Sequence, residues 1–425
     1  MKLLFRTFFL AAFLAQSISA RSCTVFTAAR GGEVFAAANE DDYNPFIRTW
    51  FSPPGKDDFG LVSFGYADLL AQAGMNEHGL FYDFTAQYGF DPAKYKYTHP
   101  YNGDVFSEIL RKYRTVKEAL TFLKTHNYTG TSQALLADAT GASVIINPDS
   151  ALKKTSNAQV STNFNILEAA KKNYSCQRFD LATQMLSGKE PLSVGLFRDI
   201  LQKTHQEGNL STQYSAIYDL KRQKVYVYLF HNFEQPWIFD LKKELDKGYR
   251  MLNLAELFST GFAYESYAQQ HPLYLKEKIL AEFRTGNLEQ ATEKYLKLLD
   301  RTAQRDSLTK FALLEVALQL VKDSYNKSTN GKPWPYWFNF YNAYDVFLMH
   351  DRRLTSASLL LQKLIKHQDF DLKYKYFITE IDGYINAVMS NKHKSVELYK
   401  AIADDAEHAY PISAARARRM LEVLR

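Results

Sequence analysis

Cysteine and long apolar runs are both scarce in this sequence. Its 425 residues include only two cysteines, Cys23 and Cys176, which cannot build a disulfide framework or a four-thiolate zinc site. No stretch approaches the roughly 18 uninterrupted apolar residues of a membrane-spanning helix. The sequence has 52 Lys and Arg residues against 46 Asp and Glu residues. The basic residues form no long run, which argues against a nucleic-acid partner.

Motifs for cofactors are missing as well. The sequence has no H-E-x-x-H, no paired cysteine–histidine spacing, no phosphate-binding glycine loop and no dinucleotide fingerprint. We therefore expect neither a metal nor a cofactor. The composition, 46% hydrophobic and 23% charged, is that of a globular protein, and the length suggests two or three domains.

The first 22 residues have the pattern of a secretory signal peptide. Lys2 and Arg6 accompany an apolar run that ends near residue 14, and small residues follow up to Ala20. A buried first helix and a lipid anchor on Cys23 are the alternatives, although Arg21 fits a lipidation site poorly. Loss of this leader removes three positive charges and no acid, so the net charge of +6 falls to +3. We expect a secreted or periplasmic protein.

Residues 23–245 alternate between short strand patterns and helical patterns, which predicts an α+β domain. Hairpins are expected where two apolar runs flank a polar turn. The expected strands are 23–28, 34–38, 60–64, 79–84, 133–138, 142–146, 214–220 and 224–229, and the expected helices are 105–113 and 115–125.

Residues 246–425 carry helical periodicity almost throughout, with no strand pattern, and predict an all-α domain. The pair at 273–283 and 288–299 resembles one tetratricopeptide-like hairpin, although no 34-residue repeat is visible. Further helices are expected at 306–324, 337–350, 354–367, 372–390 and 411–424. We interpret this part of the chain as a scaffold or binding surface.

Cys23 is the residue with the clearest chemical potential. If the chain is cut between Ser22 and Cys23, the thiol stands on the first residue of the mature protein. The new α-amine, with an ordinary pKa of about 7.7–8.0, can then accept the thiol proton and serve as the general base. Position alone leaves a buried structural cysteine as an equal alternative.

The neighbouring motifs favour the catalytic alternative. Cys-Thr-Val-Phe at 23–26, followed by Ala-Asn-Glu-Asp at 38–41, resembles the choloylglycine hydrolase and penicillin V acylase family of N-terminal-nucleophile hydrolases. The related penicillin-biosynthesis acyltransferases share the pattern. Gly-Met-Asn-Glu-His-Gly-Leu at 74–80 is similar to the most specific motif of that family. The segments 160–164 and 212–220 resemble its internal T-N segment and a late strand, so the resemblance covers about residues 23–240.

This resemblance implies a fold, an activity and site residues. The fold is a four-layer αββα sandwich, followed here by the helical domain, and the activity is hydrolysis of linear amides through a thioester. Cys23 would be the nucleophile, Asp41 would orient its α-amine, and Asn163 would donate to the oxyanion. Asn39 would brace the same hairpin. The substrate would be a small amide with an acyl or aromatic group; a homo-oligomer is left open.

The sequence departs from the family pattern in the residue before N-x-D. An arginine often stands there, and this chain has Ala38. Arg48 and Arg178 could supply a guanidinium from elsewhere, but their sequence context indicates surface residues.

A second departure concerns the oxyanion. The asparagine that follows G-L in many members is absent, and Thr85 or Ala86 occupies its approximate place. Tyr82 and Asp83 are further substitutes, so these supporting residues are candidates and the second oxyanion donor is left open.

The other candidate groups are expected to be structural. His78 lies in a predicted surface turn, and His205 and His231 have no motif around them. Cys176 is expected to be a plain thiol without a disulfide to Cys23. Two alternatives to the hydrolase are an acyltransferase that uses the same acyl-enzyme and a binding protein that has lost catalysis and works through its helical domain.

Overall fold

The computed structural model describes residues 23–87, 96–101, 103–148, 150–166, 176–301, 307–334, 346–367, 372–405 and 410–425. The chain divides into two compact units. The first extends to Ala268, and the second begins at Gln269 and also includes Ala67–Leu69. Each unit is described by itself below.

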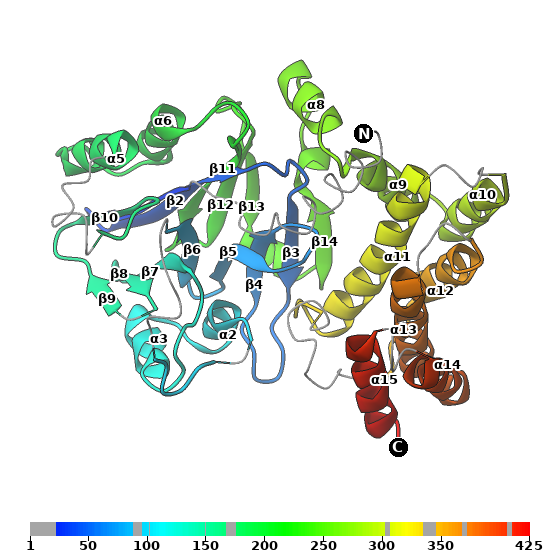
Figure 1. The fold of residues 1–425 in the computed structure, drawn as a ribbon. Coiled ribbons are helices and arrows are strands. Elements are labelled where there is room, and N and C mark those ends of the chain that lie inside the picture. Colours follow the sequence, from blue (N-terminus) through cyan, green and yellow to red (C-terminus); the bar gives the residue numbers. More distant parts are fainter. Residues whose placement is uncertain are drawn as a thin grey trace, which may run out of the picture. The chain divides into compact units, whose positions relative to one another are not determined.

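The first unit contains two antiparallel sheets (Figure 1). The six-stranded sheet has the order β10-β1-β2-β11-β12-β13. Its strands are β1 (Thr24–Arg30), β2 (Glu33–Asp42), β10 (Ala158–Ser161), β11 (Ser211–Asp219), β12 (Lys224–Leu229) and β13 (Trp237–Asp240). The predicted hairpins at 23–38 and 214–229 are confirmed as β1–β2 and β11–β12.

The second sheet has eight strands in the order β14-β3-β4-β5-β6-β7-β8-β9. They are β3 (Arg48–Ser52), β4 (Leu61–Gly65), β5 (Ala71–Asn76), β6 (Phe81–Ala86), β7 (Ser132–Ala137), β8 (Ser143–Asn147), β9 (Ser150–Lys153) and β14 (Arg250–Asn253). The predicted hairpin at 133–146 is confirmed as β7–β8. The strands β3, β5, β9, β10, β13 and β14 are not among the predicted ones, and the last four of these have only four residues each, which is too few for a clear period.

Alternation along β1 separates two layers of core. Cys23 and Val25 belong to one buried cluster with Phe64 and Met75 of the eight-stranded sheet. Phe26, on the opposite face, packs with helices α5 (Gln177–Ser187) and α6 (Val194–Thr204), which cover that face of the six-stranded sheet (Figure 1). Cys23 therefore faces the layer between the sheets.

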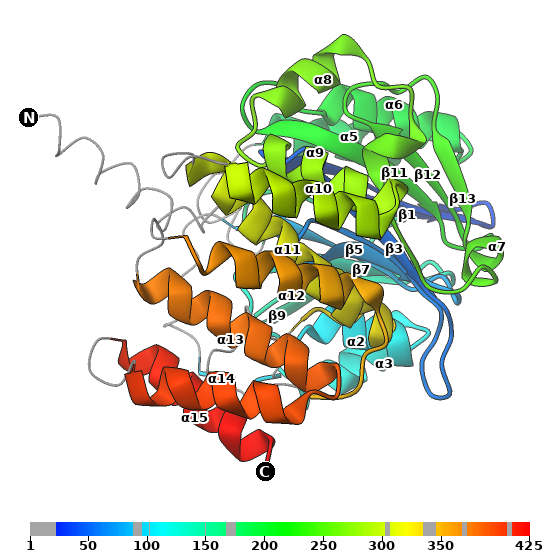
Figure 2. The ribbon, with the colours of Figure 1, turned by 90° about the vertical axis from the view of Figure 1, so that its right-hand side faces the viewer.

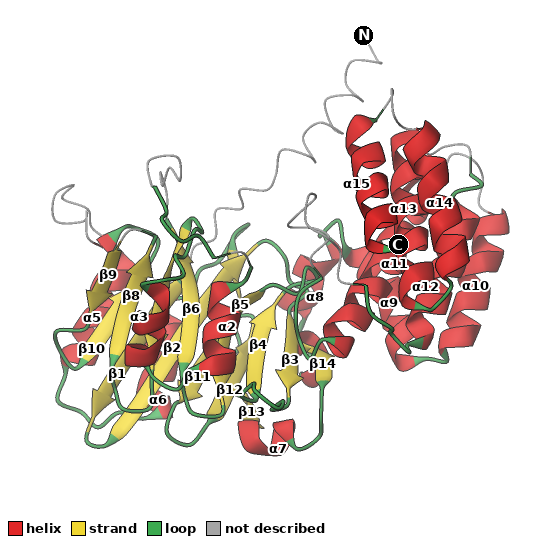
Figure 3. Ribbon diagram, turned by 90° about the horizontal axis from the view of Figure 1, so that it is seen from below, coloured by secondary structure: helices red, strands yellow, loops and turns green. Residues whose placement is uncertain are grey.

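Two predicted helices of the first unit are confirmed. They are α2 (Val105–Lys112) and α3 (Val116–Leu123), which lie over the eight-stranded sheet in Figure 3. Thr115 caps α3: its hydroxyl accepts from the Glu118 N–H, and the Glu118 carboxylate accepts from the Thr115 N–H. This capping box explains why the helix begins where the sequence pattern placed it.

The first unit continues beyond residue 245, where the sequence predicted its end. It includes α7 (Leu241–Leu245), β14, the 3₁₀ helix η2 (Leu254–Leu257) and most of α8 (Phe262–Gln269). The expectation that no strand follows residue 245 is wrong, because β14 pairs with β3. A four-residue strand at a sheet edge leaves almost no alternation to detect.

The second unit is helical in the residues that the structure describes from 270 onward (Figure 2). Its helices are α9 (Tyr274–Thr285), α10 (Leu288–Arg301), α11 (Ser307–Ser328), α12 (Arg352–Leu364), α13 (Leu372–Val388), α14 (Lys392–Asp405) and α15 (Pro411–Val423). The helix expected at 337–350 is not confirmed: 346–350 are not helical, and 337–345 lie outside the described residues. The sequence analysis missed α14.

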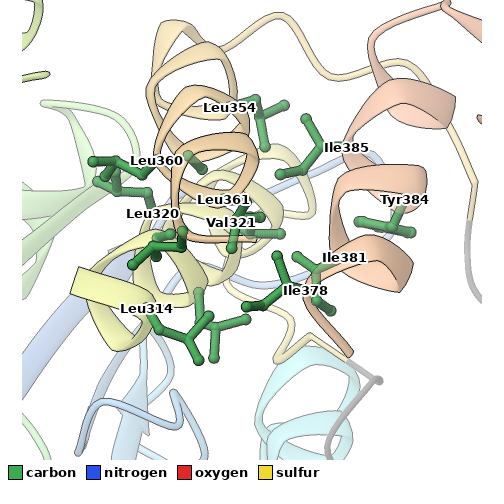
Figure 4. Packing of buried hydrophobic residues seen from close by; sticks show 14 of the residues in the cluster. Leu314, Leu320, Val321, Leu354, Leu360, Leu361, Ile378, Ile381, Tyr384 and Ile385 are labelled. Carbon is green, nitrogen blue, oxygen red and sulfur yellow. The ribbon is translucent and has the colours of Figure 1, made fainter. Parts of the chain in front are cut away.

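One apolar core runs through the second unit. Leu320 and Val321 of α11, Leu361 of α12 and Ile381 of α13 belong to it, and Figure 4 shows Val321 next to Leu361. The 22 residues of α11 are buried on most sides, so this helix is the centre of the unit. Within the described residues, no helix has the length and apolarity required to cross a membrane.

Candidate active site

The ends of three neighbouring strands meet around Cys23. β1 pairs with β2 in the register Thr24↔Asn39, so Cys23 lies opposite Glu40. On the other side, the register of β1 with β10 brings Asn163 level with Cys23. Residues that are 140 positions apart in the sequence therefore meet at one end of the six-stranded sheet.

The Cys23 thiol is buried, with 2% of the residue exposed. Its Sγ donates to Oε2 of Glu40 across 3.7 Å. Burial raises the pKa of the thiol well above its ordinary value, and the charges of Glu40, Asp41 and Asp83 raise it further. The thiolate would therefore need a positive charge or a base nearby in order to form.

Asp41 is a fully buried carboxyl with several donors. It pairs with Thr212 of β11, whose hydroxyl donates to Oδ1. Gln206 Nε2 donates to Oδ2 at 2.5 Å, and the Arg178 guanidinium lies 3.4 Å from the same oxygen. Burial outweighs these donors and raises the pKa of Asp41 to about 8. This carboxyl is short of positive charge, which an adjacent ammonium group would supply.

Arg178, at the start of α5, joins the residues of this site. Its Nη1 donates to Thr24 Oγ1 at 2.8 Å and lies 3.4 Å from Asp41, and its Nη2 donates to Asn163 Oδ1 at 3.0 Å. The side chain is only 19% exposed. The interpretation of Arg178 as a surface residue is therefore wrong, and a guanidinium does reach the site from outside the N-x-D segment.

We expect the change Arg178→Ala to lower kcat for amide turnover about 10–100-fold, because both Asp41 and Asn163 lose a charged donor that positions them. Arg178→Lys should recover part of this loss, since one ammonium cannot bond both sides of the site. Steady-state kinetics give the measurement, and Arg198→Ala, a change at a partly exposed arginine on α6, is the control. Equal kcat values for the Ala variants of Arg178 and Arg198 would contradict the positioning role.

Asn163 is held at both ends of its amide group. Its Oδ1 accepts from Arg178, and its Nδ2 donates to the Ala86 carbonyl at 3.3 Å. The guanidinium can only donate, so this contact settles which end of the amide is the oxygen. The N–H groups of Asn163 are thereby directed toward β6, on the Cys23 side of the sheet.

Asn39 has a bracing role that the structure makes specific. Its Nδ2 donates to the Leu201 carbonyl at 3.0 Å and to Thr204 Oγ1 at 3.1 Å, while its Oδ1 accepts from Ser215 at 2.6 Å. Asn39 thus ties β2 to α6 and β11, on the face opposite to the Cys23 thiol.

The four candidates for a second oxyanion donor, Tyr82, Asp83, Thr85 and Ala86, all belong to β6, and alternation along the strand places them on two opposite faces of the sheet. Tyr82 points away from Cys23: its hydroxyl donates to the Ala71 carbonyl and its ring packs on Phe106 of α2. The suggestion that Tyr82 substitutes for the missing donor is therefore wrong, because strand alternation places it on the outer face. Thr85 faces the six-stranded sheet, and its hydroxyl lies 2.7 Å from that of Ser161.

A buried pair of carboxyls beside Cys23 was not foreseen. Glu40 of β2 and Asp83 of β6 are 3% and 1% exposed. Burial raises the pKa of Asp83 well above its ordinary value, and both the charge of Glu40 and a hydrogen bond with it raise that pKa further. Two negative charges buried side by side repel each other, so the pair favours the state in which one carboxyl is protonated.

This pair should set the pH at which the thiol reacts. Glu40→Gln removes a negative charge that raises the pKa of Cys23, so the thiolate should form at lower pH in this variant. The rate of iodoacetamide alkylation, followed from pH 6 to pH 10, should shift to lower pH. Glu289→Gln, a change at an exposed carboxylate on α10, should leave the profile in place. A shift to higher pH would contradict this assignment.

The motif at 74–80 has a structural role. The Asn76 side chain accepts from the backbone N–H groups of His78 and Leu80 and donates to two carbonyls at the end of α2. Gly79 has φ +75° and a Cβ there would lie 2.0 Å from the Leu220 carbonyl oxygen, so only glycine fits. His78 packs its ring edge on Phe59. The motif therefore builds the β5–β6 turn.

The remaining sequence candidates lie outside this arrangement. Arg48 is 1% exposed, so its interpretation as a surface residue is wrong. Both cysteines are free, as expected, and Cys176 accepts from Thr162 Oγ1 at 3.5 Å. His205 and His231 lie side by side beyond Gln206, with ring centroids 4.9 Å apart.

Two cavities of the first unit have linings that do not include Cys23. One, of about 760 Å³, is lined by residues of α3, β8 and β9. The other, of about 420 Å³, lies between β10 and α5. Neither is lined by Cys23, Asp41 or Asn163.

No family model and no curated protein matches this chain. Among solved structures, it is similar to penicillin V acylase from Agrobacterium tumefaciens, with 18% identity, 55% of this chain and 92% of that chain covered, and a TM-score of 0.41. It is also similar to two variants of conjugated bile acid hydrolase from Clostridium perfringens, with 14% and 15% identity and TM-scores of 0.47 and 0.46. Each match covers 56% of this chain and 99% of the other chain. These proteins belong to the group that the sequence motifs resemble, and at TM-scores below 0.5 the similarity carries no further argument about this chain.

Proposed function

We propose that this protein is a hydrolase of linear amides whose nucleophile is the thiol of an N-terminal Cys23. The observation that carries the proposal is the position of Arg178, which bonds both Asp41 and Asn163 and the residue that follows Cys23. One guanidinium thereby holds a buried carboxylate and an amide donor on either side of a buried thiol. A structural cysteine would need none of these contacts.

In the first chemical step, Cys23 sulfur attacks the amide carbonyl carbon, and the thiol proton passes to the α-amine of the same residue. The carbonyl oxygen becomes an oxyanion, to which the Asn163 amide donates. The C–N bond then breaks. The leaving nitrogen takes the proton back from the α-ammonium and departs as an amine, which leaves the acyl group on sulfur as a thioester.

In the second step, water attacks the thioester carbon and gives its proton to the α-amine. The C–S bond breaks, the carboxylic acid leaves, and the sulfur recovers its proton. An acyltransferase would follow the same course with an amine in place of water, and the arrangement of Cys23, Asp41 and Asn163 is equally suited to either acceptor.

Asp41 would hold the α-ammonium in these steps. Its carboxyl lies on the helix side of the sheet with Gln206, while the Cys23 thiol faces the inter-sheet layer. The carboxyl therefore suits a partner on the backbone of Cys23 better than a partner at sulfur. Its pKa of about 8 in the uncleaved chain would fall once the ammonium is present.

The finer features belong to the same proposal. The sheets with their covering helices form the four-layer αββα sandwich of N-terminal-nucleophile hydrolases, and the second unit is a separate helical domain. Residues 1–22 are a secretory leader whose removal exposes the amine. Phe64, Tyr214 and Tyr218 share the buried layer of Cys23, which supports a substrate with an acyl or aromatic group.

The mass of the intact mature protein tests this proposal. A chain that begins at Cys23 is required, and a chain that begins at Arg21 or carries lipid on Cys23 would overturn the mechanism. A panel of N-acyl amides, assayed for released amine, should then show turnover by the mature form and none by a form that retains Ser22.

A further inference from the structure

Two histidines and a glutamate gather where α6 and β12 end. His205 follows α6, Glu207 comes two residues later, and His231 follows β12. One ring nitrogen of each histidine and one carboxylate oxygen of Glu207 lie within 4.8 Å of one another. The His205 and His231 rings are partly buried, and Glu207 is exposed.

The hydrogen bonds of His205 prepare it to bind a cation. Its Nδ1 lies 2.5 Å from the Gln202 carbonyl oxygen, which can only accept, so Nδ1 carries the hydrogen. The lone pair of the neutral ring is then on Nε2, which lies 3.2 Å from Glu207 Oε1. Two acceptors at this distance require a proton or a metal cation between them.

His231 is oriented by a second set of contacts. Its Nε2 lies 2.9 Å from Ser211 Oγ, and the Ser211 hydroxyl itself donates to the Gln206 carbonyl at 3.2 Å. The serine oxygen therefore accepts from Nε2–H, which leaves the lone pair of the neutral ring on Nδ1. A histidine whose second nitrogen donates to a fixed oxygen is typical of metal sites.

We propose that His205, Glu207 and His231 bind one Zn²⁺ ion. Two imidazoles and a carboxylate are a ligand set that zinc accepts, with water in the fourth position. Zinc bonds of 2.0–2.2 Å in a tetrahedron place neighbouring ligand atoms roughly 3.3–3.6 Å apart. The 3.2 Å between His205 and Glu207 is close to that spacing. This site departs from the expectation, drawn from the sequence, that no metal is bound.

The metal site adjoins the segment that holds Asp41. Gln206, between two of the ligands, donates to Asp41 Oδ2, and its backbone N–H and carbonyl bond with Thr212. Thr212 in turn donates to Asp41 Oδ1. Bound zinc would fix residues 205–212 and with them both donors to the carboxylate. The metal site stands on its own contacts, whereas this effect on turnover rests on the proposed function.

Zinc binding by the purified full-length mature protein tests the site. After treatment with EDTA and its removal, titration against a chromogenic zinc chelator should show one Zn²⁺ per chain. His205→Gln and His231→Gln should each weaken binding at least ~100-fold, because loss of a ligand costs more than loss of its hydrogen-bond partner. Glu207→Gln should weaken it as well, and its exposed position makes misfolding a small risk.

Two controls make the outcome decisive. His393→Gln, a change at an exposed histidine on α14, should bind zinc as the wild type does. Asp41→Asn keeps every ligand and should also bind zinc normally, even if it abolishes turnover, so failure of the metal site and failure of the proposed function are distinguishable. Equal affinities for wild type and the His205 and His231 variants would overturn the site and leave a His205–Glu207 ion pair.

Discussion

Replacing Cys23 with alanine is expected to lower amide turnover by about 10⁴-fold or more, to the level of residual binding effects. Alanine removes the only atom that can form the acyl-enzyme. The buried side chain is small and its thiol makes only a long contact, of 3.7 Å, to Glu40, so the fold should persist. Turnover of the best N-acyl amide and a thermal melt of each variant give the measurement.

Two further variants separate the roles of sulfur and position. Cys23→Ser keeps a nucleophile of similar shape but lower reactivity, and should retain a trace of activity and form an oxygen ester in place of a thioester. Cys176→Ala removes the other free thiol, which accepts a long hydrogen bond from the Thr162 hydroxyl, and should leave turnover unchanged. If Cys23→Ala retains wild-type turnover, the proposed mechanism is excluded.

Asp41→Asn is expected to lower kcat about 100-fold or more, which is the range for loss of acid–base support. Asparagine has the same shape but no charge, so it cannot hold the α-ammonium of Cys23. Thr212, Gln206 and Arg178 all donate to the Asp41 carboxylate, and the NH₂ group of an asparagine cannot accept from them. We expect the pH profile of kcat to lose the limb that reports the amine.

The same variant should not lose stability in the uncleaved chain. The pKa of Asp41 rises from 3.8 to about 8 in the fold, so the folded state binds the proton more tightly than the unfolded state. That contribution to stability is present below pH 4 and is lost as the pH rises through 8. At pH 8 the wild-type chain has lost this contribution and asparagine has no charge to bury, so Asp41→Asn should melt no lower than Asp199→Asn, a change at a partly exposed carboxylate on α6. A collapse of the fold at this pH would assign the loss of activity to misfolding.

The sequence predicts the part of this site that lies in short motifs. Cys23, Asp41 and Asn163 each stand in a segment that resembles a family motif, and the structure brings all three to one end of the six-stranded sheet. The first hairpin is equally readable, because apolar runs flank a glycine turn. What made these residues predictable is that each motif is local, and the pairing of strands then determines where they meet.

The remainder depends on contacts that have no local pattern. Arg178 reaches Asp41 across 137 positions from the first turn of α5, where an arginine usually indicates a solvated face. Glu40 and Asp83 meet between two sheets, and neither residue stands out in an apolar strand. The face on which Tyr82 points depends on one register, which a single sequence does not specify. The roles of these residues can be recognised only once the pairing of the strands and the packing of the sheets are known.

The bulge in β11 has a consequence for insertions and deletions in this chain. Thr212 pairs with Asp41 and Tyr214 pairs with Glu40, although regular alternation would put residues 212 and 214 on one face. Gln213 is the extra residue, fixed by its side chain to the carbonyls of Asp42 and Ser211. Deletion of residue 213 would remove the bulge, so that Thr212 or Tyr214 would point to the wrong face of the sheet. A substitution at 213 should therefore be tolerated far better than a deletion there.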